Sequence, residues 1–411
     1  MANSFYTVSQ ISNELVRLME NELVMGKAVG TDTLDSERVK NGGSIKVRRQ
    51  AQYLGQDNNL DLSSYSEDVV EGTVTVSMDQ TWSNKVSISA TDRTLSFDRY
   101  SDMILKPMAR RAAEKVEASI AALYSKFYLF DGTPGTVPST FAELANAGAI
   151  FSDAGNAMGG RLAFHSPAAS AKLASAIQAS YVGSNNKTAF EKALVGTYAG
   201  FENYQSVFAP THTVGALGGT PLVNGASQNV TYATAKDTWS QTLNTDGWTN
   251  SVTGVLKAGD VFTIAGVNAV NPNTKADTGR LQTFTVLADA DSGASTGPAA
   301  LTISPPMITS GAYKTVTAAP ADNAAITVKT GTAATSYRQS LLIDPMAIAL
   351  VSRPLDIPSN DGPKTSTVTG EFVTMSVSSW VDGNTIAENM RFDMLYKPVV
   401  LDPRRGMRLT S

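Results

Sequence analysis

The sequence predicts an α+β protein into which an all-β domain is inserted. Apolar residues recur at three- and four-residue spacing in two segments of the first 130 residues, which is typical of amphipathic helices. Several later segments alternate polar and apolar residues, as strands with one buried face do. Residues 215–335 contain no Glu, six Lys or Arg and seven Asp, and the lack of this strong helix former favours β structure there.

Composition excludes several classes of function. The chain has 411 residues with 33 Lys and Arg against 37 Asp and Glu, so the net charge of −4 argues against tight, sequence-independent DNA binding. It has no Cys and two His, which excludes Cys-ligated metal and leaves few residues for a catalytic triad. No signal peptide and no membrane-spanning run is visible. We therefore predict no catalytic residue, no cofactor, no metal and no membrane contact.

The first predicted element is an amphipathic helix. Thr7 and Gln10 fit a capping box, and Gly26 and Gly30 mark its end. Its apolar stripe comprises Ile11, Leu15, Leu18, Met19 and Leu23. This stripe could pack on its own domain or on a neighbouring molecule.

Two alternating segments, 44–50 and 72–78, flank a polar tip and predict a long hairpin. The hairpin could be solvated, or it could reach over another subunit and pair charges there. The charged residues expected at such an interface are Lys46, Arg48, Arg49, Asp57, Asp61, Glu67 and Asp68.

A long helix is expected at about 97–128, with Pro107 causing a kink or a short preceding turn. One stripe is apolar, and it includes Met108, Ala112, Val116, Ile120 and Phe127. The other face is basic, with Lys106, Arg110, Arg111 and Lys115. Glu114 and Glu117 could balance a solvated basic face; alternatively, this face contacts an acidic surface or nucleic acid.

The remaining chain divides into a mixed region, the β-rich stretch and a final extended region. His165 follows a short apolar strand and is predicted to be a hydrogen-bonded core residue. The β-rich stretch predicts a small barrel or sandwich. Its expected strands are 229–234, 260–267, 281–288, 300–304, 313–318 and 325–329. The end of the chain, 401–410, is expected to be a basic tail.

The motif search finds no P-loop, no nucleophile elbow and no His-Glu-x-x-His. Trp239, Trp248 and Trp380 could stack on sugars, which leaves open an alternative function: a carbohydrate-binding or hydrolysing, β-rich phage surface protein.

The segment from Lys257 to Val267 reads Lys-Ala-Gly-Asp-Val-Phe-Thr-Ile-Ala-Gly-Val. With the order of elements, this segment resembles the major capsid (coat) protein of tailed double-stranded DNA phages, of the short-tailed Salmonella-phage coat type. The resemblance implies a Johnson-type capsid fold with an inserted β-barrel. It implies an N-terminal arm (1–43), an extended loop (44–80), a peripheral domain with a spine helix (81–135 and 365–411), an axial domain (136–214 and 336–364) and the insertion (215–335).

The resemblance also implies function and partners. Such proteins have no catalytic site and assemble through hexamers and pentamers into an icosahedral shell in the bacterial cytoplasm, with scaffolding protein and portal as transient partners. The shell encloses double-stranded DNA by weak, non-specific contact, and it expands as DNA enters. A loop of the insertion crosses two-fold axes, and Asp246 and Trp248 occupy the similar place here. Acidic residues of the N-arm available for a scaffold contact are Glu14, Glu20 and Glu22.

Overall fold

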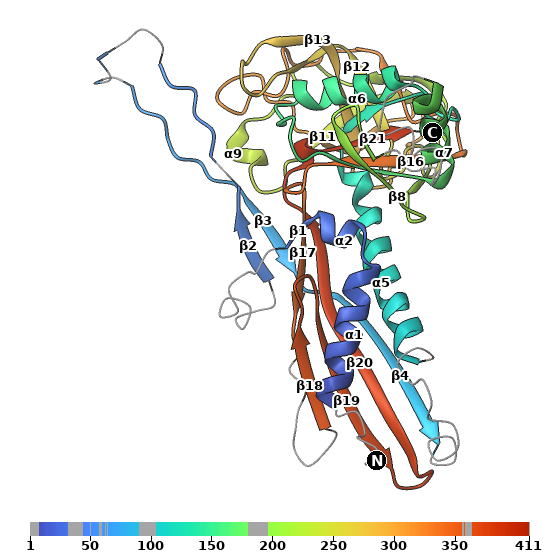
Figure 1. Cartoon of the computed structure of the whole chain (residues 1–411). Helices are drawn as coiled ribbons and strands as arrows, with labels where there is room; N and C mark the ends of the chain where they lie inside the picture. The colour runs from blue at the N-terminus through green and yellow to red at the C-terminus, as the bar shows by residue number, and fades with distance from the viewer. Residues whose placement is uncertain are drawn as a thin grey trace. The chain divides into compact units, whose positions relative to one another are not determined.

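In a computed structural model, the chain forms two compact units (Figure 1). The first comprises Met1–Ile45, Val76–Ile120 and Ile348–Val399, and the second comprises Lys46–Thr75, Ala121–Ala347 and Val400–Ser411. The structure describes residues 8–31, 44–49, 51–56, 60–61, 63, 65–89, 104–179, 196–355, 357 and 364–410. Within these ranges, no helix combines the length and apolar character needed to cross a membrane.

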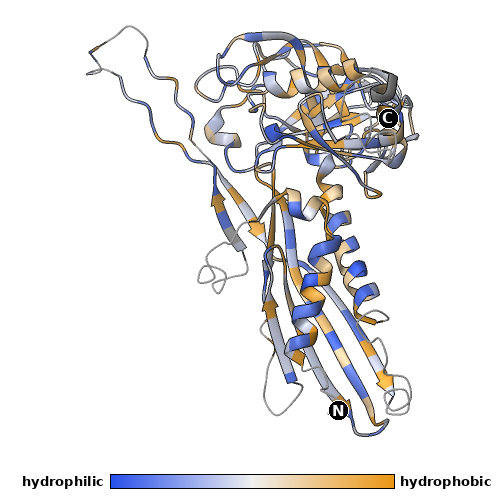
Figure 2. Ribbon diagram, in the orientation of Figure 1, coloured by the Kyte–Doolittle hydropathy of each residue, from blue (hydrophilic) through white to orange (hydrophobic). Residues whose placement is uncertain are grey.

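The first unit is built on a six-stranded sheet in the order β1-β17-β20-β19-β18, with β4 also pairing with β20. Its strands are β1 (Gly30–Thr31), β4 (Gln80–Ser89), β17 (Ile348–Arg353), β18 (Lys364–Thr369), β19 (Thr374–Asp382) and β20 (Ala387–Val400). The alternation predicted for the last strand is confirmed, because Met390, Phe392, Met394 and Tyr396 are all buried. Figure 2 shows the resulting alternate bands along the long strands.

The described helices of this unit are α1 (Val8–Glu22), α2 (Met25–Ala28) and α5 (Lys106–Ala121). Helix α1 packs its apolar face on β18 and β19, so the stripe is buried within its own unit. The predicted stripe of the long helix is confirmed, from Met108 at 5% exposed to Ile120 at 0%. Pro107 is the second residue of α5, which directly follows the π-helical residues Ile104 and Leu105.

The predicted length of that helix is wrong at its end, because α5 gives way to a 3₁₀ helix, η2 (Ala122–Lys126). Phe127 is fully buried and packs against Gly406. A Cβ at position 406 would lie 2.2 Å from the Phe127 ring, so this contact needs glycine. The expected start of the long helix before residue 104 and the capping residue Thr7 lie outside the described residues.

A buried carboxylate joins α5 to the turn after α1. Glu117 is 3% exposed, and its oxygens accept hydrogen bonds from the backbone N–H groups of Val24, Met25 and Gly26 at 2.9–3.0 Å. Burial raises the pKa of Glu117, and the three N–H donors oppose that rise. The expectation that Glu117 balances a solvated basic face is therefore wrong.

We predict that Glu117→Gln destabilises the protein by about 1–3 kcal/mol, because an amide NH₂ would face a buried N–H donor. Glu114→Gln is the matched control, since Glu114 forms partly exposed pairs with Arg110 and Arg111. Urea unfolding followed by circular dichroism measures both variants. Equal loss of stability in the two variants would contradict this role of Glu117.

The second unit contains a mixed sheet in the order β5-β21-β16-β6-β8-β7, with β9 also pairing with β16. Its strands are β5 (Leu129–Asp131), β6 (Leu162–His165), β7 (Gly196–Tyr198), β8 (Phe201–Gln205), β9 (Thr211–Thr213), β16 (Ser336–Ile343) and β21 (Gly406–Thr410). The associated helices are α6 (Phe141–Asp153), α7 (Pro167–Ala179) and η3 (Pro403–Arg405).

The predicted basic tail is wrong. Residues 406–410 form the buried strand β21 between β16 and β5. Arg408 is fully buried there and donates to the Gly259 carbonyl at 2.7 Å and to Thr285 Oγ1 at 3.1 Å. Burial lowers the pKa of Arg408 to about 10. The five-part division of the chain expected from sequence stays a prediction.

The insertion is a six-stranded sheet in the order β10-β11-β14-β13-β12-β15. Its elements are β10 (Gly219–Val223), α9 (Tyr232–Ala235), β11 (Gln241–Trp248), β12 (Val261–Val270), β13 (Asp277–Val286), β14 (Ala299–Ser304) and β15 (Ile326–Val328). A bridge from Leu222 to Ala325 brings the first and last strands together, so the sheet is nearly a closed barrel. The expected strand at 229–234 is wrong because α9 begins there, and 313–318 contributes only a bridge at Val316.

Asp260 connects this barrel to the mixed sheet. Its fully buried carboxylate accepts from His212 Nε2 on β9 at 2.8 Å and from Thr330 Oγ1 at 2.9 Å. It also accepts from the N–H groups of Gly215 and Lys257 at 3.0 and 2.7 Å. Both ends of the insertion are therefore tied to one carboxylate.

The preceding residue is Gly259, at a φ of 101°, and a Cβ there would lie 3.1 Å from the His212 ring. The Gly-Asp pair of the sequence motif is thus explained by the positive φ at Gly259 and by the hydrogen bonds that Asp260 accepts.

His165 is a core residue, as predicted. It is 1% exposed, with Nδ1 2.9 Å from Ser340 Oγ and Nε2 2.9 Å from Asn203 Oδ1. Burial lowers the pKa of His165 from 6.5 to about 4, so the folded protein keeps this ring neutral.

Between about pH 6.5 and pH 4, the unfolded chain binds a proton at His165 and the folded chain does not. The free energy of unfolding therefore falls as the pH falls through this range. We predict that the free energy of unfolding of the wild type falls by about 2 kcal/mol more than that of His165→Gln between pH 7 and pH 5. Urea unfolding at several pH values measures the difference. Parallel pH profiles would contradict the prediction.

Candidate assembly interface

The root of the hairpin is fixed by contacts with the insertion. The hairpin strands are β2 (Ser44–Arg48) and β3 (Thr73–Ser77). Thr73 donates to Asp237 Oδ1 twice, from its N–H at 2.9 Å and from Oγ1 at 2.8 Å. On the other arm, Arg49 Nη1 donates to the Lys236 carbonyl at 3.1 Å. Both arms are therefore held by the short segment that follows α9.

Aromatic rings strengthen this attachment. The Tyr313 hydroxyl accepts from the Gln52 N–H at 2.9 Å and lies 3.4 Å from the Val70 carbonyl, so it bridges the two arms. The Tyr313 ring stacks on Tyr232 of α9. Arg49 lies over the indole ring of Trp239, 5.7 Å from its centroid. These contacts fix the direction in which the hairpin leaves the unit.

Beyond its root, the hairpin extends as a long arm (Figure 1), and several of its apolar side chains are exposed. Large hydrophobic residues there are exposed: Tyr53 (56%), Leu54 (51%), Leu60 (105%) and Val69 (64%). Glu67 stiffens this part by accepting from the N–H groups of Leu54 and Gly55 at 3.1 Å, and Tyr65 donates to the same carboxylate. Hydrogen bonding by Tyr65 lowers the pKa of Glu67. A braced arm with exposed apolar residues is suited to contact another molecule.

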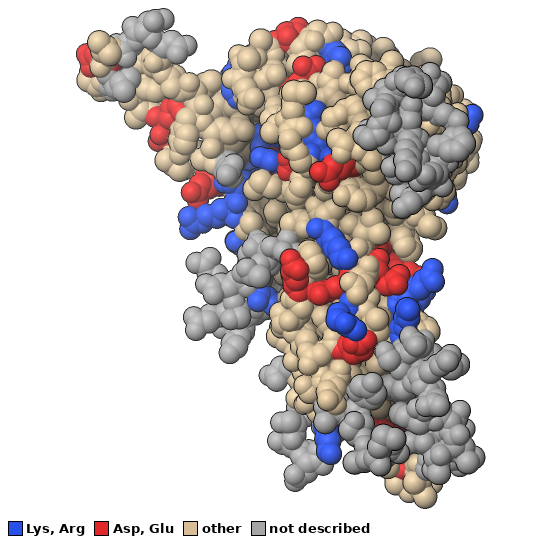
Figure 3. Space-filling model, in the orientation of Figure 1, with Lys and Arg blue, Asp and Glu red and all other residues tan. Residues whose placement is uncertain are grey.

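The predicted hairpin charges have different roles in the structure. Arg48 pairs with Glu71 of the other arm at 3.2 Å, and Asp61 accepts from the Ser63 N–H at 3.0 Å. Lys46 and Asp68 are exposed, and Asp57 lies outside the described residues. Figure 3 shows Lys and Arg beside Asp and Glu at the base of the hairpin. Several of these charges are thus paired within the hairpin, which sequence reasoning did not predict.

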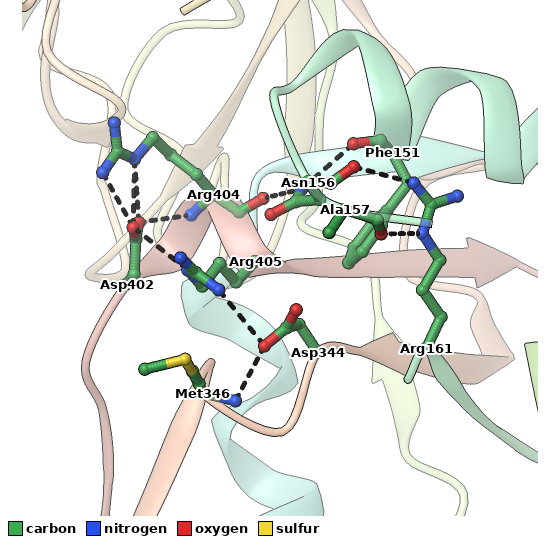
Figure 4. A network of polar contacts seen from close by, with 9 residues as sticks. All are labelled: Phe151, Asn156, Ala157, Arg161, Asp344, Met346, Asp402, Arg404 and Arg405. Carbon is green, nitrogen blue, oxygen red and sulfur yellow. Dashed lines mark hydrogen bonds and ion pairs between the residues drawn. The ribbon is translucent and has the colours of Figure 1, made fainter. Parts of the chain in front are cut away.

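A second polar network surrounds η3 (Figure 4). Asp402 forms a two-pronged pair with Arg404, with its oxygens 3.0 Å from Nε and 2.8 Å from Nη2. Arg405 Nη1 lies 3.3 Å from Asp344, and Arg161 donates from Nε to the Ala157 carbonyl at 2.6 Å. Burial raises the pKa of Asp402, but Arg404 and Arg405 outweigh it and hold that pKa below its ordinary value. This carboxylate therefore stays ionised.

On the spine helix, Glu114 pairs with Arg110 at 3.5 Å and with Arg111 at 3.0 Å, whereas Lys106 and Lys115 are exposed. This arrangement favours the interpretation of a solvated basic face.

The three N-arm glutamates do not form one surface. Glu20 accepts from the Phe372 N–H at 3.0 Å, Glu14 pairs with Arg17 at 2.9 Å, and Glu22 is exposed.

The placement of Asp246 and Trp248 in a loop is wrong, because both lie in strand β11. Trp248 is 3% exposed in the barrel core and donates to Thr245 Oγ1 at 2.9 Å, while Asp246 is opposite Leu222 of β10. The alternating burial of Gln241, Leu243 and Thr245 explains why a strand forms here. Trp239 is also buried, at 5% exposed, so neither of these two rings is open to a sugar, whereas Trp380 is half-buried with Lys85 Nζ 5.4 Å from its ring centroid.

The described part of the chain contains no group of three or more metal-ligating side chains. Its prominent features are a braced arm, a barrel that holds the root of the arm, and a basic helix face. These features define a class of structural proteins that assemble with other subunits.

Comparisons with known proteins give the family. The family described as "P22 coat protein - gene protein 5" matches residues 1–411, and the chain belongs to that family. It is 26% identical over 405 residues to a major capsid protein of Acyrthosiphon pisum secondary endosymbiont phage 1, covering 95% of this chain and 92% of that protein. The chain is therefore a phage coat protein, and the predicted α+β capsid fold with an inserted β domain is confirmed.

Solved structures with similarity to the chain include phage coat proteins. The mature capsid of bacteriophage PhiM1 is 10% identical, with a TM-score of 0.46 and coverage of 94% of this chain and 86% of that one. The I-domain of the CUS-3 coat protein is 29% identical, with a TM-score of 0.20, and covers 28% of this chain and 100% of that one.

We predict that Asp237→Ala loosens the hairpin root without unfolding the chain, because it removes both hydrogen bonds to Thr73. Amide exchange at Thr73 is expected to be roughly five- to tenfold faster. Asp246→Ala, in the same domain, is the matched control. Hydrogen exchange read by mass spectrometry on the hairpin peptides tests this, and unchanged exchange in Asp237→Ala would contradict it.

Proposed function

We propose that this coat protein is the major subunit of an icosahedral shell, built from hexamers and pentamers, that encloses phage double-stranded DNA. The observation that carries this proposal is the hairpin: its root is fixed to the insertion, while Tyr53, Leu60 and Val69 are exposed. Exposed apolar surface on a braced arm gains free energy only when another molecule covers it. In a ring of identical subunits, the neighbouring copy is the molecule available to do so.

The remaining partners follow from the same proposal. Scaffolding protein and portal act transiently during assembly in the bacterial cytoplasm, and of the three N-arm glutamates Glu22 is the one most open to a scaffold contact. The net charge of −4 suits a wall that holds DNA weakly and non-specifically, because strong phosphate binding would resist packaging and ejection. The protein acts as a structural subunit and not as an enzyme.

We predict that Leu60→Asp impairs shell assembly and leaves the monomer folded, since Leu60 is fully exposed in the single chain. Ser63→Asp adds the same charge to another exposed position of the hairpin and serves as the control. Sedimentation velocity and negative-stain microscopy measure shell yield, and far-UV circular dichroism measures fold. Normal yield from Leu60→Asp would contradict the proposed contact.

A further inference from the structure

A pocket of about 400 Å³ lies beside the hairpin root, and its lining is rich in arginine. It is bounded by both arms of the hairpin, the end of α6, the loop after β12 and the segment leading into η3. Among the described residues, four guanidinium groups and one carboxylate, that of Asp402, line it; the arginines are Arg48, Arg49, Arg404 and Arg405. All of these residues belong to the second unit.

Three of the four arginines have carboxylate partners within the chain. Arg48 pairs with Glu71, Arg404 with Asp402, and Arg405 with Asp344. Asp402 and Asp237 also act on Arg49 through their charges, but neither forms an ion pair with it. Among the arginines that line the pocket, Arg49 is therefore the one without an ion-paired carboxylate in the described part of the chain.

Arg49 has an incomplete set of partners. Its Nη1 bonds to the Lys236 carbonyl and its plane lies over Trp239, but no carboxylate of the described chain forms an ion pair with it. Its Nε is buried and has no hydrogen-bond acceptor among the residues that the structure describes. Burial lowers the pKa of Arg49, and the nearby charges of Asp402 and Asp237 offset only part of that fall. A buried guanidinium N–H without an acceptor costs free energy until an anion reaches it.

We propose that this arginine pocket receives an acidic side chain from a second copy of the chain. A carboxylate fits the donor geometry of a guanidinium and would accept from the Arg49 Nε–H, which has no acceptor in the described chain. The donor of that carboxylate is a second copy, because each copy carries four more acidic than basic residues and exposes acids such as Asp61 and Asp68 on its own hairpin. This inference rests on the proposed function, since a shell places second copies beside every pocket.

The pocket also explains the position of Arg49. Its guanidinium is held against Trp239, whose ring lies under Arg404 as well, 5.4 Å from its centroid. A side chain fixed by stacking loses little further rotamer entropy when it binds an anion. Arg49 is thus pre-organised for a carboxylate before the second copy arrives.

The test uses Arg49→Lys, because a carbodiimide can couple the amine of the new side chain to a neighbouring carboxylate. The reagent adds to the carboxylate and forms an activated ester. The lysine amine then attacks the carboxyl carbon of this ester, which forms an amide and releases the reagent as its urea. Shells are assembled without DNA, in phosphate-free buffer, from equal amounts of ¹⁴N- and ¹⁵N-labelled Arg49→Lys subunits. Arg48→Lys is the matched control, because the partner of Arg48 is Glu71 of the same chain.

For Arg49→Lys, we expect cross-linked peptides joined through position 49, of which about half link a ¹⁴N to a ¹⁵N peptide, as random mixing of two copies requires. For Arg48→Lys, we expect links in which both peptides carry the same isotope. Shells of Arg49→Lys that form without a mixed-isotope link at position 49 would overturn the inference. Failure of wild-type subunits to form any shell would instead overturn the proposed function.

If Arg49→Lys does not assemble, the wild-type chain provides the test. Phenylglyoxal, which modifies accessible guanidinium groups, should react with Arg49 in the free subunit and spare it in shells. Equal modification of Arg49 in both states would overturn the inference, since an occupied pocket must shield this side chain.

Discussion

The buried carboxylate of Asp260 fixes the inserted barrel on the mixed sheet, and the position of the hairpin root depends on that barrel. It binds the start of the insertion at Gly215, its far side at Thr330, and His212 of the mixed sheet. The barrel thereby has one orientation on the mixed sheet. The barrel in turn holds the hairpin root through Asp237. A two-stranded arm is marginally stable alone, so its direction depends on this chain of contacts.

A buried carboxylate also fixes a loop in the first unit, where Glu117 accepts hydrogen bonds from three backbone N–H groups of the segment after α1. In both cases a buried acid satisfies donors that regular secondary structure leaves free. Such contacts specify one arrangement of a loop, because any other arrangement leaves a buried charge unsatisfied. The parts of the chain that meet other subunits therefore leave from well-defined positions.

The sequence predicted the elements whose pattern is local and periodic, such as the buried stripe of α5 and the alternation of β20. It did not predict contacts made between distant segments. Glu117 and Arg408 looked like surface charges because their partners lie far away in the chain. Strand β11 was missed because the family resemblance placed Asp246 and Trp248 in a loop, although Leu243 and Trp248 are buried in the barrel core. At the interface, composition identified the charged hairpin, but the pairing of its charges required three-dimensional structure.

The central claim is that the insertion fixes the root of the hairpin so that its distal part can lie on another copy. A cryo-electron microscopy reconstruction of shells assembled from the purified protein tests it most directly. The account predicts density for Tyr53, Leu60 and Val69 against a neighbouring subunit, with Thr73 still beside Asp237 of its own subunit. A hairpin that lies on its own subunit, or a root detached from Asp237, would contradict it.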